Sequence, residues 1–386
     1  MTARGRLTLG ILANEFFDPG SGRMGGFGWA AANLARLFAD DPELGVRPIV
    51  IAGEAVRGWT DRDGRMHGAE FIPRTWNAWS DRRRLRQASV GALVAIDFRP
   101  SYRRVLRALP DAPLIVWIRD PRTPDDNRLV RSVRVPGDDE VPGGLGEVRC
   151  DGLGVEVERR RRAGRPVHLT VTDPFLVPKI ESAYGLRAEG VRTLPNPVEV
   201  GAGAIAKSQR PTVAFLGRLD PIKRPWVFTA LASRFPGTTF LMLGRSHFSG
   251  PGSWRPADLP PNVVMLGHAG DAAKRQALSA AWVLVNTSVH EALAVSFLEA
   301  LASETPLVAM VDAGGLVPRF GCSVGQSGGT GLDKIDVLSD ALARLLADHA
   351  LRRRLGAEGR AWVARHHGRA AFLAAFAGLV QRPGAA

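Results

Sequence analysis

Short apolar runs alternate with longer amphipathic segments along almost the whole chain. A strand covered by helices on both faces reads as a continuous apolar run, whereas a helix lying on a sheet repeats its apolar positions every three or four residues. In the first half the runs predict strands at Leu7–Ala13, Val46–Ala52, Gly68–Ile72, Leu93–Ile96, Leu114–Ile118 and His168–Val171. Helices are predicted between them, among them Trp29–Phe38 and Tyr102–Leu109. This alternation is typical of a parallel sheet between two layers of helices.

The second half repeats the pattern after a break at Leu194-Pro195-Asn196-Pro197, which we interpret as an interdomain linker. It predicts strands at Val213–Leu216, Phe240–Leu243, Val263–Leu266, Trp282–Asn286 and Pro306–Met310. Helices are predicted at Trp226–Phe235, Ala272–Ala280, Val295–Ser303 and along the tail Ile335–Leu379. We therefore expect an α/β fold of two Rossmann-like, doubly wound domains, residues 1–198 and 199–365, followed by a C-terminal helix over 366–386. Such sheets bind ligands beyond the carboxyl ends of their strands.

The stretch Arg131–Arg165 breaks the alternation, because it is rich in glycine, proline and charge without a clear period. A structureless loop of this length inside a compact domain is usually functional or disordered. We predict a long loop here, either mobile or facing an acceptor.

The composition is that of a soluble globular protein large enough for two domains, with 45% hydrophobic and 23% charged residues in 386. No apolar run reaches the length of a membrane span, and Met1–Arg6 leads into the first strand without a cleavage signal, so we expect a cytoplasmic protein. Cys150 and Cys322 cannot build a disulfide framework, and no Cys/His cluster has the spacing of a zinc site.

The formal net charge of +13 is divided between the two halves, with local clusters at Arg82-Arg83-Arg84-Arg86 and Arg159-Arg160-Arg161-Arg162. Two interpretations stay open: a solvated arginine-rich surface, or peripheral contact with anionic lipid at the inner face of a membrane. No nucleic-acid-binding module accompanies the charge, so we expect no nucleic-acid partner.

The first candidate site follows the predicted strand that ends at Leu216. In Gly217-Arg218-Leu219-Asp220-Pro221-Ile222-Lys223-Arg224-Pro225, Gly217 permits a tight exit from the strand and Pro225 suits the first turn of a helix. Arg218 and Lys223 would then lie beside a helix N-terminus. Backbone N–H groups, the helix dipole and two cations together suit a diphosphate.

The second candidate site is His290-Glu291-Ala292-Leu293-Ala294-Val295-Ser296-Phe297-Leu298-Glu299. Glu291 ends the loop after a predicted strand, and Glu299 lies on the helix that follows. Eight residues of helical rise separate them by at most ~12 Å, the scale of a nucleoside diphosphate sugar. One carboxylate can accept from sugar hydroxyls and the other from a ribose diol.

In these two motifs the sequence resembles the retaining glycosyltransferases of family 4, which have the GT-B fold with two Rossmann-like domains facing a central cleft. The specific matches lie in residues 212–224 and 286–316, and Gly25-Gly26-Phe27-Gly28 is similar to the family's amino-terminal glycine loop. The resemblance implies an acceptor-side first domain, a donor-binding second domain and a last helix that crosses back to the first domain. The implied donor-binding residues are Gly26, Gly28, Gly217, Arg218, Lys223, His268, His290, Glu291, Leu293, Ala294, Val295 and Glu299; the implied catalytic residues are Glu291, Arg218, Lys223 and Arg119.

Two positions depart from the family pattern. Ala292-Leu293-Ala294 follows Glu291, where the family usually has Gly-Phe-Gly, so the added methyl groups could narrow the sugar pocket. Arg119-Asp120 follows the strand Leu114–Ile118, where the family commonly has a histidine. An arginine cannot act as a base at neutral pH. Arg119 would bind an oxygen of the substrate or form a structural ion pair with Asp120 or another neighbour.

Other motifs are weak. Gly20-Ser21-Gly22-Arg23-Met24-Gly25, with Glu54 after the next strand, has the dinucleotide pattern but begins too far from its strand. Asp61-Arg62-Asp63 has the form of a metal-binding pair, but it lies in a polar stretch that reads as a solvated turn. His366-His367 reads as surface, and His290 as an orienting or capping residue.

The sequence thus predicts a metal-independent transferase without a cofactor, whose partners are a nucleotide-sugar donor and a hydroxyl acceptor. A non-catalytic binder of nucleotide sugars or glycans on the same fold stays open, as does a related epimerase or phosphorylase. A phosphorylase would need a pyridoxal lysine, and none of Lys179, Lys207, Lys223, Lys274 and Lys334 has an obvious context for one.

Overall fold

A computed structural model describes residues 6–16, 25–55, 64–138, 142, 152–246, 253–254, 256 and 258–380. The chain forms two compact units. The first contains residues 1–121, 149–197 and 372–386, and the second contains residues 122–148 and 198–371. Residues 122–148 therefore group with the second unit, although their place in the chain lies within the first predicted domain.

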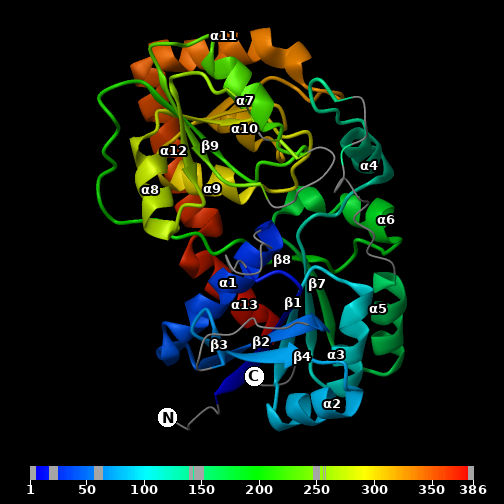
Figure 1. The fold of residues 1–386 in the computed structure, drawn as a ribbon. Helices are drawn as coiled ribbons and strands as arrows, with labels where there is room; N and C mark the ends of the chain where they lie inside the picture. Colours follow the sequence, from blue (N-terminus) through cyan, green and yellow to red (C-terminus); the bar gives the residue numbers. More distant parts are fainter. Residues whose placement is uncertain are drawn as a thin grey trace. The chain divides into compact units, whose positions relative to one another are not determined.

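The first unit is built on a sheet with the strand order β3-β4-β2-β1-β5-β6-β7-β8 (Figure 1). All neighbouring strands are parallel except β3 and β4. The strands are β1 (Leu7–Ala13), β2 (Val46–Ala55), β3 (Arg65–Met66), β4 (Ala69–Arg74), β5 (Ala92–Ile96), β6 (Leu114–Ile118), β7 (Val167–Val171) and β8 (Arg192–Thr193). The helices are α1 (Gly26–Ala39), α2 (Ala78–Gln87), α3 (Arg103–Ala108), α5 (Leu153–Arg162) and α6 (Lys179–Tyr184), with short 3₁₀ helices at Pro42–Leu44, Pro100–Tyr102 and Pro174–Leu176.

The second unit is built on a fully parallel sheet with the order β11-β10-β9-β12-β13-β14. Its strands are β9 (Thr212–Leu216), β10 (Thr239–Leu243), β11 (Val263–Gly267), β12 (Val283–Asn286), β13 (Leu307–Ala309) and β14 (Gly321–Ser323). Its helices are α4 (Pro124–Arg131), α7 (Pro225–Ala232), α8 (Asp271–Ala280), α9 (Val295–Ala302), α10 (Leu316–Phe320), α11 (Ile335–Ala347) and α12 (His349–His367), with a 3₁₀ helix at Leu332–Lys334.

Both sheets wind in the same way. In each, the first strand of the unit lies in the middle, the next strands extend to one side, and the chain then crosses to the other side. This arrangement is the doubly wound one, and it explains why the central strands read as continuous apolar runs: every residue of β5, β6 and β12 is buried. The predicted fold class is confirmed.

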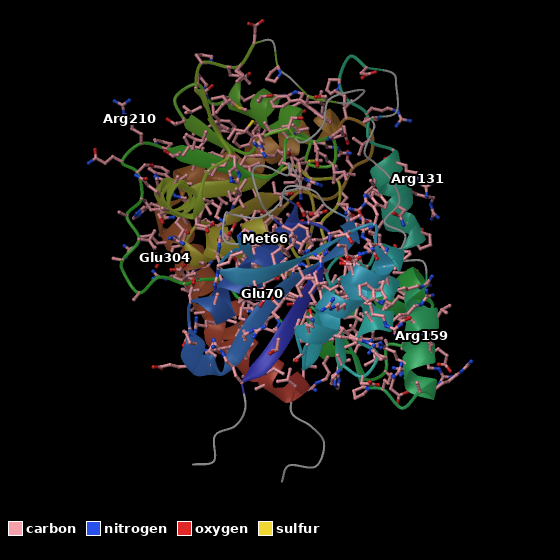
Figure 2. The ribbon with its side chains drawn as sticks, turned by 60° about the horizontal axis from the view of Figure 1, so that its bottom comes forward. Met66, Glu70, Arg131, Arg159, Arg210 and Glu304 are labelled. Carbon is pink, nitrogen blue, oxygen red and sulfur yellow. The ribbon has the colours of Figure 1, made fainter. Side chains whose placement is uncertain are left out.

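The predicted loop at Arg131–Arg165 is wrong over residues 153–162, which form α5. Its inward face combines Leu153 and Val157 with Glu156 and Arg160, and all four are buried. Arg160 donates to Glu156 (3.3 Å) and to the carbonyl of Ala112 (2.9 Å), so the buried guanidinium is paired. A helix whose inner face is half charged has no apolar period. Arg159, labelled in Figure 2, lies on the same helix and pairs with Glu156 at 2.5 Å.

Residues 122–138 belong to the second unit through their side chains. A capping box between Thr123 and Asp126 starts α4. Val130 within α4 and Val133 after it lie in the unit's hydrophobic core. Val133 forms a parallel bridge with Gly329, and the N–H of Arg134 donates to the Gly329 carbonyl at 3.1 Å. The donor-side candidate residues of this unit are therefore packed in part by a segment that precedes the linker.

The tail predicted as helical over Ile335–Leu379 consists of α11, α12 and α13 (Arg369–Val380). Asp348 accepts from the N–H of Leu351 (2.8 Å) and starts α12, and the extended backbone of Gly368 ends it. Phe372 and Phe376 on α13 contact Phe38 of the first unit, with ring centroids 6.4 and 5.1 Å away. Among the helices of the described residues, none has the length and hydropathy to span a bilayer.

Candidate functional site

The two candidate motifs lie at neighbouring strand ends in the second unit. Its strand order places the topological switch point between β9 and β12, where the chain changes direction across the sheet. Ligands of doubly wound sheets bind beyond the carboxyl ends of the strands at this point. Arg218 and Lys223 follow β9, and Glu291 follows β12, so one strand-end site contains all three.

The turn after β9 depends on close backbone packing. The carbonyl oxygen of Gly217 lies 1.8 Å from where a Cβ on Gly244 would be, and Gly244 has a φ of +150°, so position 244 accepts only glycine. Arg218 follows this contact. Its Nε lies 2.9 Å from Oδ2 of Asp220, and its side chain is partly exposed. The turn after β9 therefore carries a cation that solvent can reach.

Lys223 and Glu291, 68 positions apart, form an ion pair of 2.6 Å between Nζ and Oε1. The Nδ2 of Asn286 (3.0 Å) and the hydroxyl of Ser288 (2.7 Å) donate to the same Oε1. Three donors from two strand ends therefore orient one carboxylate oxygen. Asn286 and Ser288 were not among the predicted site residues, although a polar run directly after a buried strand could have indicated them.

The electrostatics keep Glu291 ionised. Burial by itself would raise the pKa of this carboxyl, but the charge of Lys223 and the hydrogen bonds from Lys223, Ser288 and Asn286 outweigh it, and the pKa is lowered from its usual value. A buried carboxylate with one fully bonded oxygen can direct its other oxygen to a ligand hydroxyl.

Arg224 holds the loop that carries Lys223, and sequence reasoning missed it. Its backbone is left-handed (φ +47°), which is costly for a residue with a Cβ, and its side chain is fully buried. Nη2 donates to the carbonyls of Ser327 (2.7 Å) and Gly329 (3.1 Å), and the hydroxyl of Thr287 donates to the carbonyls of Lys223 (2.6 Å) and Arg224 (3.0 Å). Burial lowers the pKa of Arg224 to about 10, against the opposing charge of Asp333.

Helix α9 begins at Val295, four residues after Glu291. Leu293 and Ala294 are buried, Ala294 is the N-cap residue, and Val295 opens the helix. An alanine has no side-chain oxygen to accept from the first-turn N–H groups, which supports their use by a ligand oxygen. The structure thus pairs the Glu291 carboxylate with Lys223, and the α9 N-terminus comes four residues later in the chain.

Glu299, eight residues along the chain, has a cationic partner of its own. Nζ of Lys274 on α8 lies 2.6 Å from Oε1 of Glu299 and 3.2 Å from Oδ1 of Asp271. Burial by itself would lower the pKa of Lys274, but Glu299 and Asp271 outweigh it and raise the pKa, so Lys274 is a cation. Sequence reasoning missed Lys274, because neither its burial nor its contact with Glu299 can be read from the sequence.

The two predicted histidines differ in setting. His290 is only 3% exposed, and its Nδ1 lies 3.5 Å from Oδ1 of Asp126 on α4, so it contacts the segment that precedes the linker. His268 follows β11 and is exposed. Both lie at strand ends of the second sheet.

The remaining predicted residues lie in the first unit, so their contacts with a donor stay predictions. Gly26 and Gly28 form the first turn of α1, which follows β1. Arg119 follows β6 and is buried; its Nη1 donates to Oδ1 of Asn196 at 2.7 Å, and its guanidinium lies 4.7 Å from the ring centroid of Trp117. Burial lowers the pKa of Arg119 to about 10, and the Asp97 carboxylate opposes the shift.

Three sequence motifs fall wholly or partly outside the described residues: Asp61–Asp63, the glycines at positions 20 and 22, and Cys150. Within the described ranges no group of three or more His, Cys, Asp or Glu side chains is arranged to hold a metal ion.

Residues 203–362 match the family model described as glycosyl transferases group 1. The chain carries a group 1 glycosyltransferase domain. Several solved structures align with nearly the whole chain of this glycosyltransferase. Sucrose-phosphate synthase from Thermosynechococcus elongatus matches with a TM-score of 0.69 and 16% identity over 97% of this chain and 98% of that chain. HepE from Anabaena, solved in complex with UDP-glucose, matches with a TM-score of 0.69 and 15% identity over 96% of this chain and 98% of that chain. A glycosyltransferase from Rickettsia africae matches with a TM-score of 0.62 and 12% identity over 97% of this chain and 98% of that chain.

The glycosyltransferase therefore has the GT-B fold that the sequence predicted. No curated protein matches its sequence. The family match covers β9 to β14 and the loops after them, which are the elements that hold the Lys223–Glu291 pair.

Proposed function

We propose that this glycosyltransferase is a retaining, metal-independent enzyme of family 4. It would move a sugar from a nucleoside diphosphate sugar to a hydroxyl of a glycan, a glycolipid or a small molecule. The observation that carries the proposal is the Lys223–Glu291 ion pair at the switch point of the second sheet. It joins a cation suited to a diphosphate and a carboxylate suited to a sugar at the place where such a sheet binds its ligand.

The proposed roles follow from the contacts. Arg218, Lys223 and the N-terminus of α9 would hold the diphosphate, because each supplies donors or positive charge. Glu291 would accept from a sugar hydroxyl, and Glu299 from the ribose diol. Gly217 would let the backbone approach the donor closely. HepE was solved with UDP-glucose, so UDP-glucose is the first donor to test here.

The proposed chemistry separates charge between sugar and diphosphate. As the bond from the sugar to the diphosphate breaks, positive charge develops on the sugar and negative charge on the leaving diphosphate. Lys223, with Arg218, would stabilise the diphosphate, and Glu291 would face the sugar. The acceptor hydroxyl would lose its proton to the departing phosphate on the same face, which retains the configuration and needs no protein base. Arg119 could not supply one at neutral pH.

Donor binding and turnover can be tested separately. A ligand that binds the folded state raises its stability by about 2.7 kcal/mol at a hundredfold excess over Kd, so a thermal-unfolding screen over nucleotide sugars should single out the donor. Lys223→Met should abolish that shift, whereas Lys334→Met, outside the site, should preserve it. Binding without release of nucleoside diphosphate, over a broad range of acceptors, would favour a non-catalytic binder.

Metal independence is tested by measuring the release of nucleoside diphosphate during turnover. Turnover should persist in excess EDTA, because the two cationic side chains would take the place of a divalent ion at the diphosphate. Loss of turnover that is restored by Mn²⁺ or Mg²⁺ would contradict the proposal.

The proposal also includes peripheral contact with an anionic membrane.

A further inference from the structure

Helix α2 of the first unit presents an unusual face to solvent. Trp79, Arg82, Arg83 and Arg86 are exposed and follow the i, i+3, i+4, i+7 spacing of a single helix face. Asp81 and Leu85 lie on the opposite face and are buried. The spacing that normally marks the buried side of a helix here marks the outer side.

Two tryptophans dominate this face. Trp76, in the loop before the helix, is 81% exposed and Trp79 is 70% exposed, the two largest values among the large hydrophobic side chains of the described residues. The guanidinium of Arg83 lies 5.8 Å from the centroid of the Trp79 ring. Exposed indoles beside arginines are typical of a surface that contacts another molecule.

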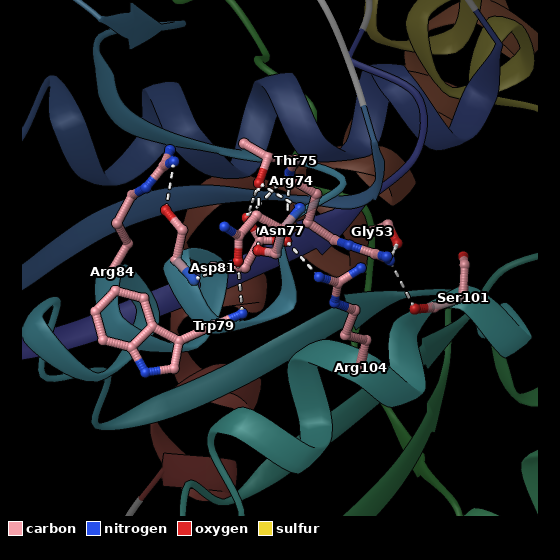
Figure 3. A network of polar contacts seen from close by, with 10 residues as sticks. Gly53, Arg74, Thr75, Asn77, Trp79, Asp81, Arg84, Ser101 and Arg104 are labelled. Carbon is pink, nitrogen blue, oxygen red and sulfur yellow. Dashed lines mark hydrogen bonds and ion pairs between the residues drawn. The ribbon is translucent and has the colours of Figure 1, made fainter.

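The fold holds this surface in place (Figure 3). Oδ1 of Asn77 accepts from the N–H groups of Trp79 (3.0 Å) and Ser80 (3.1 Å) and so starts the helix between the two tryptophans. Oδ1 of Asp81 accepts from the N–H (3.0 Å) and the hydroxyl (2.7 Å) of Thr75, and Oδ2 lies 3.4 Å from Nη2 of Arg104 on α3. The indoles are therefore exposed on a fixed turn.

We propose that Trp76, Trp79, Arg82, Arg83 and Arg86, the α2 surface, dock this protein on a bilayer that contains anionic lipid. Indole rings favour the headgroup level, where the ring contacts apolar chains and its N–H stays hydrated. Arginines on the same face meet the negative surface potential of anionic headgroups. A second copy of this chain would bring like charges together, which opposes self-association through this face.

The inference deepens the proposed membrane contact and does not depend on transferase chemistry. Its test uses the full chain and needs neither donor nor acceptor. Co-sedimentation is measured with phosphatidylcholine vesicles and with vesicles containing 30% phosphatidylglycerol, at low and high salt. Binding should require the anionic lipid and weaken with salt, because exposed charges are screened within about 10 Å at 0.1 M.

The variants separate the α2 surface from general positive charge. Arg82→Gln/Arg83→Gln/Arg86→Gln should lower the partition coefficient about fivefold per arginine, roughly a hundredfold in all. Trp76→Ser/Trp79→Ser should lower it at least tenfold and abolish quenching of protein fluorescence by brominated lipid. The matched control Arg159→Gln/Arg161→Gln/Arg162→Gln removes three exposed charges from α5 and should retain binding within about threefold. The two α2 variants should unfold at the temperature of the parent, since their altered side chains are exposed. The α5 control also loses the ion pair between Arg159 and buried Glu156, so its folded state is verified by circular dichroism before vesicle binding is compared.

Equal losses in the α2 and α5 arginine variants would overturn the proposal, as would an absence of vesicle binding at low salt. Binding of single-stranded DNA but not of vesicles, lost in the tryptophan variant, would identify nucleic acid as the occupant and also overturn it. Either failure leaves donor binding at Lys223 and Glu291 unaffected.

Discussion

Lys223 Nζ lies 2.6 Å from Glu291 Oε1, and this contact joins the loop after β9 to the loop after β12. The same oxygen accepts from Asn286 and Ser288, so the carboxylate is fixed before a ligand arrives. A preorganised pair of opposite charges suits a reaction that separates positive charge on a sugar from negative charge on a diphosphate.

The first prediction concerns the pair itself. Lys223→Met should destabilise the second unit by about 3–5 kcal/mol, because it leaves a buried carboxylate without its cation. The double variant Lys223→Met/Glu291→Gln should recover much of that loss, since it removes the uncompensated charge. Chemical denaturation of the parent, of the single variants Lys223→Met and Glu291→Gln, and of the double variant completes a double-mutant cycle. The cycle measures the coupling free energy between the two side chains. Equal stability of the single and double variants would contradict the role of the ion pair.

The second prediction separates the two glutamates. Glu299→Ala should mainly raise the donor KM, at a cost of about 1.5–3 kcal/mol, if Glu299 accepts from the ribose in both ground and transition states. Glu291→Gln should lower kcat strongly while affinity for the free nucleoside diphosphate stays nearly constant, because positive charge on the sugar develops only as the bond breaks.

Calorimetry with the sugar-free diphosphate decides between these roles. Weaker binding in the Glu291 variant but not in the Glu299 variant would reverse the assignment. Unchanged turnover in both would remove the two glutamates from the active site.

The third prediction concerns Lys274, the partner of Glu299. Lys274→Met should raise the donor KM severalfold with little change in kcat, because it frees Glu299 to turn away from the ribose without altering the groups around Glu291. Lys274→Arg should restore part of the affinity. Lys334→Met is the matched control and should have the parent's kinetics. An equal fall of kcat in Lys274→Met would indicate a role in the chemical step instead.

The fourth prediction concerns pH and the first unit. Asp97 is buried and has a positive φ of 57°. Burial, with a smaller contribution from the negative charge of Asp120, raises the pKa of Asp97 from 3.8 to about 6. A raised pKa favours the protonated carboxyl in the folded state, so its stabilising effect is complete below pH 3.8 and is lost as pH rises through 6.

Asp97→Asn should remove this dependence. Asparagine tolerates the left-handed backbone and does not titrate. The curve of unfolding free energy against pH should become flatter between pH 4 and 6, by about 2–3 kcal/mol at most. Asp111→Asn, at an exposed position of the same unit, should leave the curve unchanged. An Asp97 variant with the parent's slope would show that another group titrates.

Much of the fold is local in origin and could be predicted from the sequence. Each central strand is buried on both faces, so its apolar run is visible without any tertiary information, as in Leu114–Ile118. The motifs around Arg218 and Glu299 were also visible, because turn glycines, helix-starting proline and strand-end polar residues are short-range features. The helix α5 was not visible, since its inner face includes the buried pair Glu156–Arg160.

The sequence by itself determined the two doubly wound sheets and the residues that end their strands. Tertiary structure alone decided the partners: Lys223 for Glu291, Lys274 for Glu299, and Asp126 for His290. Asp126 comes from a segment that precedes the linker yet packs in the second unit. The physical reason is the separation of the interacting groups along the chain. The apolar period of a strand or helix and the residues of a turn are set by neighbours along the chain, whereas an ion pair between groups 68 positions apart exists only after the sheet has brought β9 beside β12.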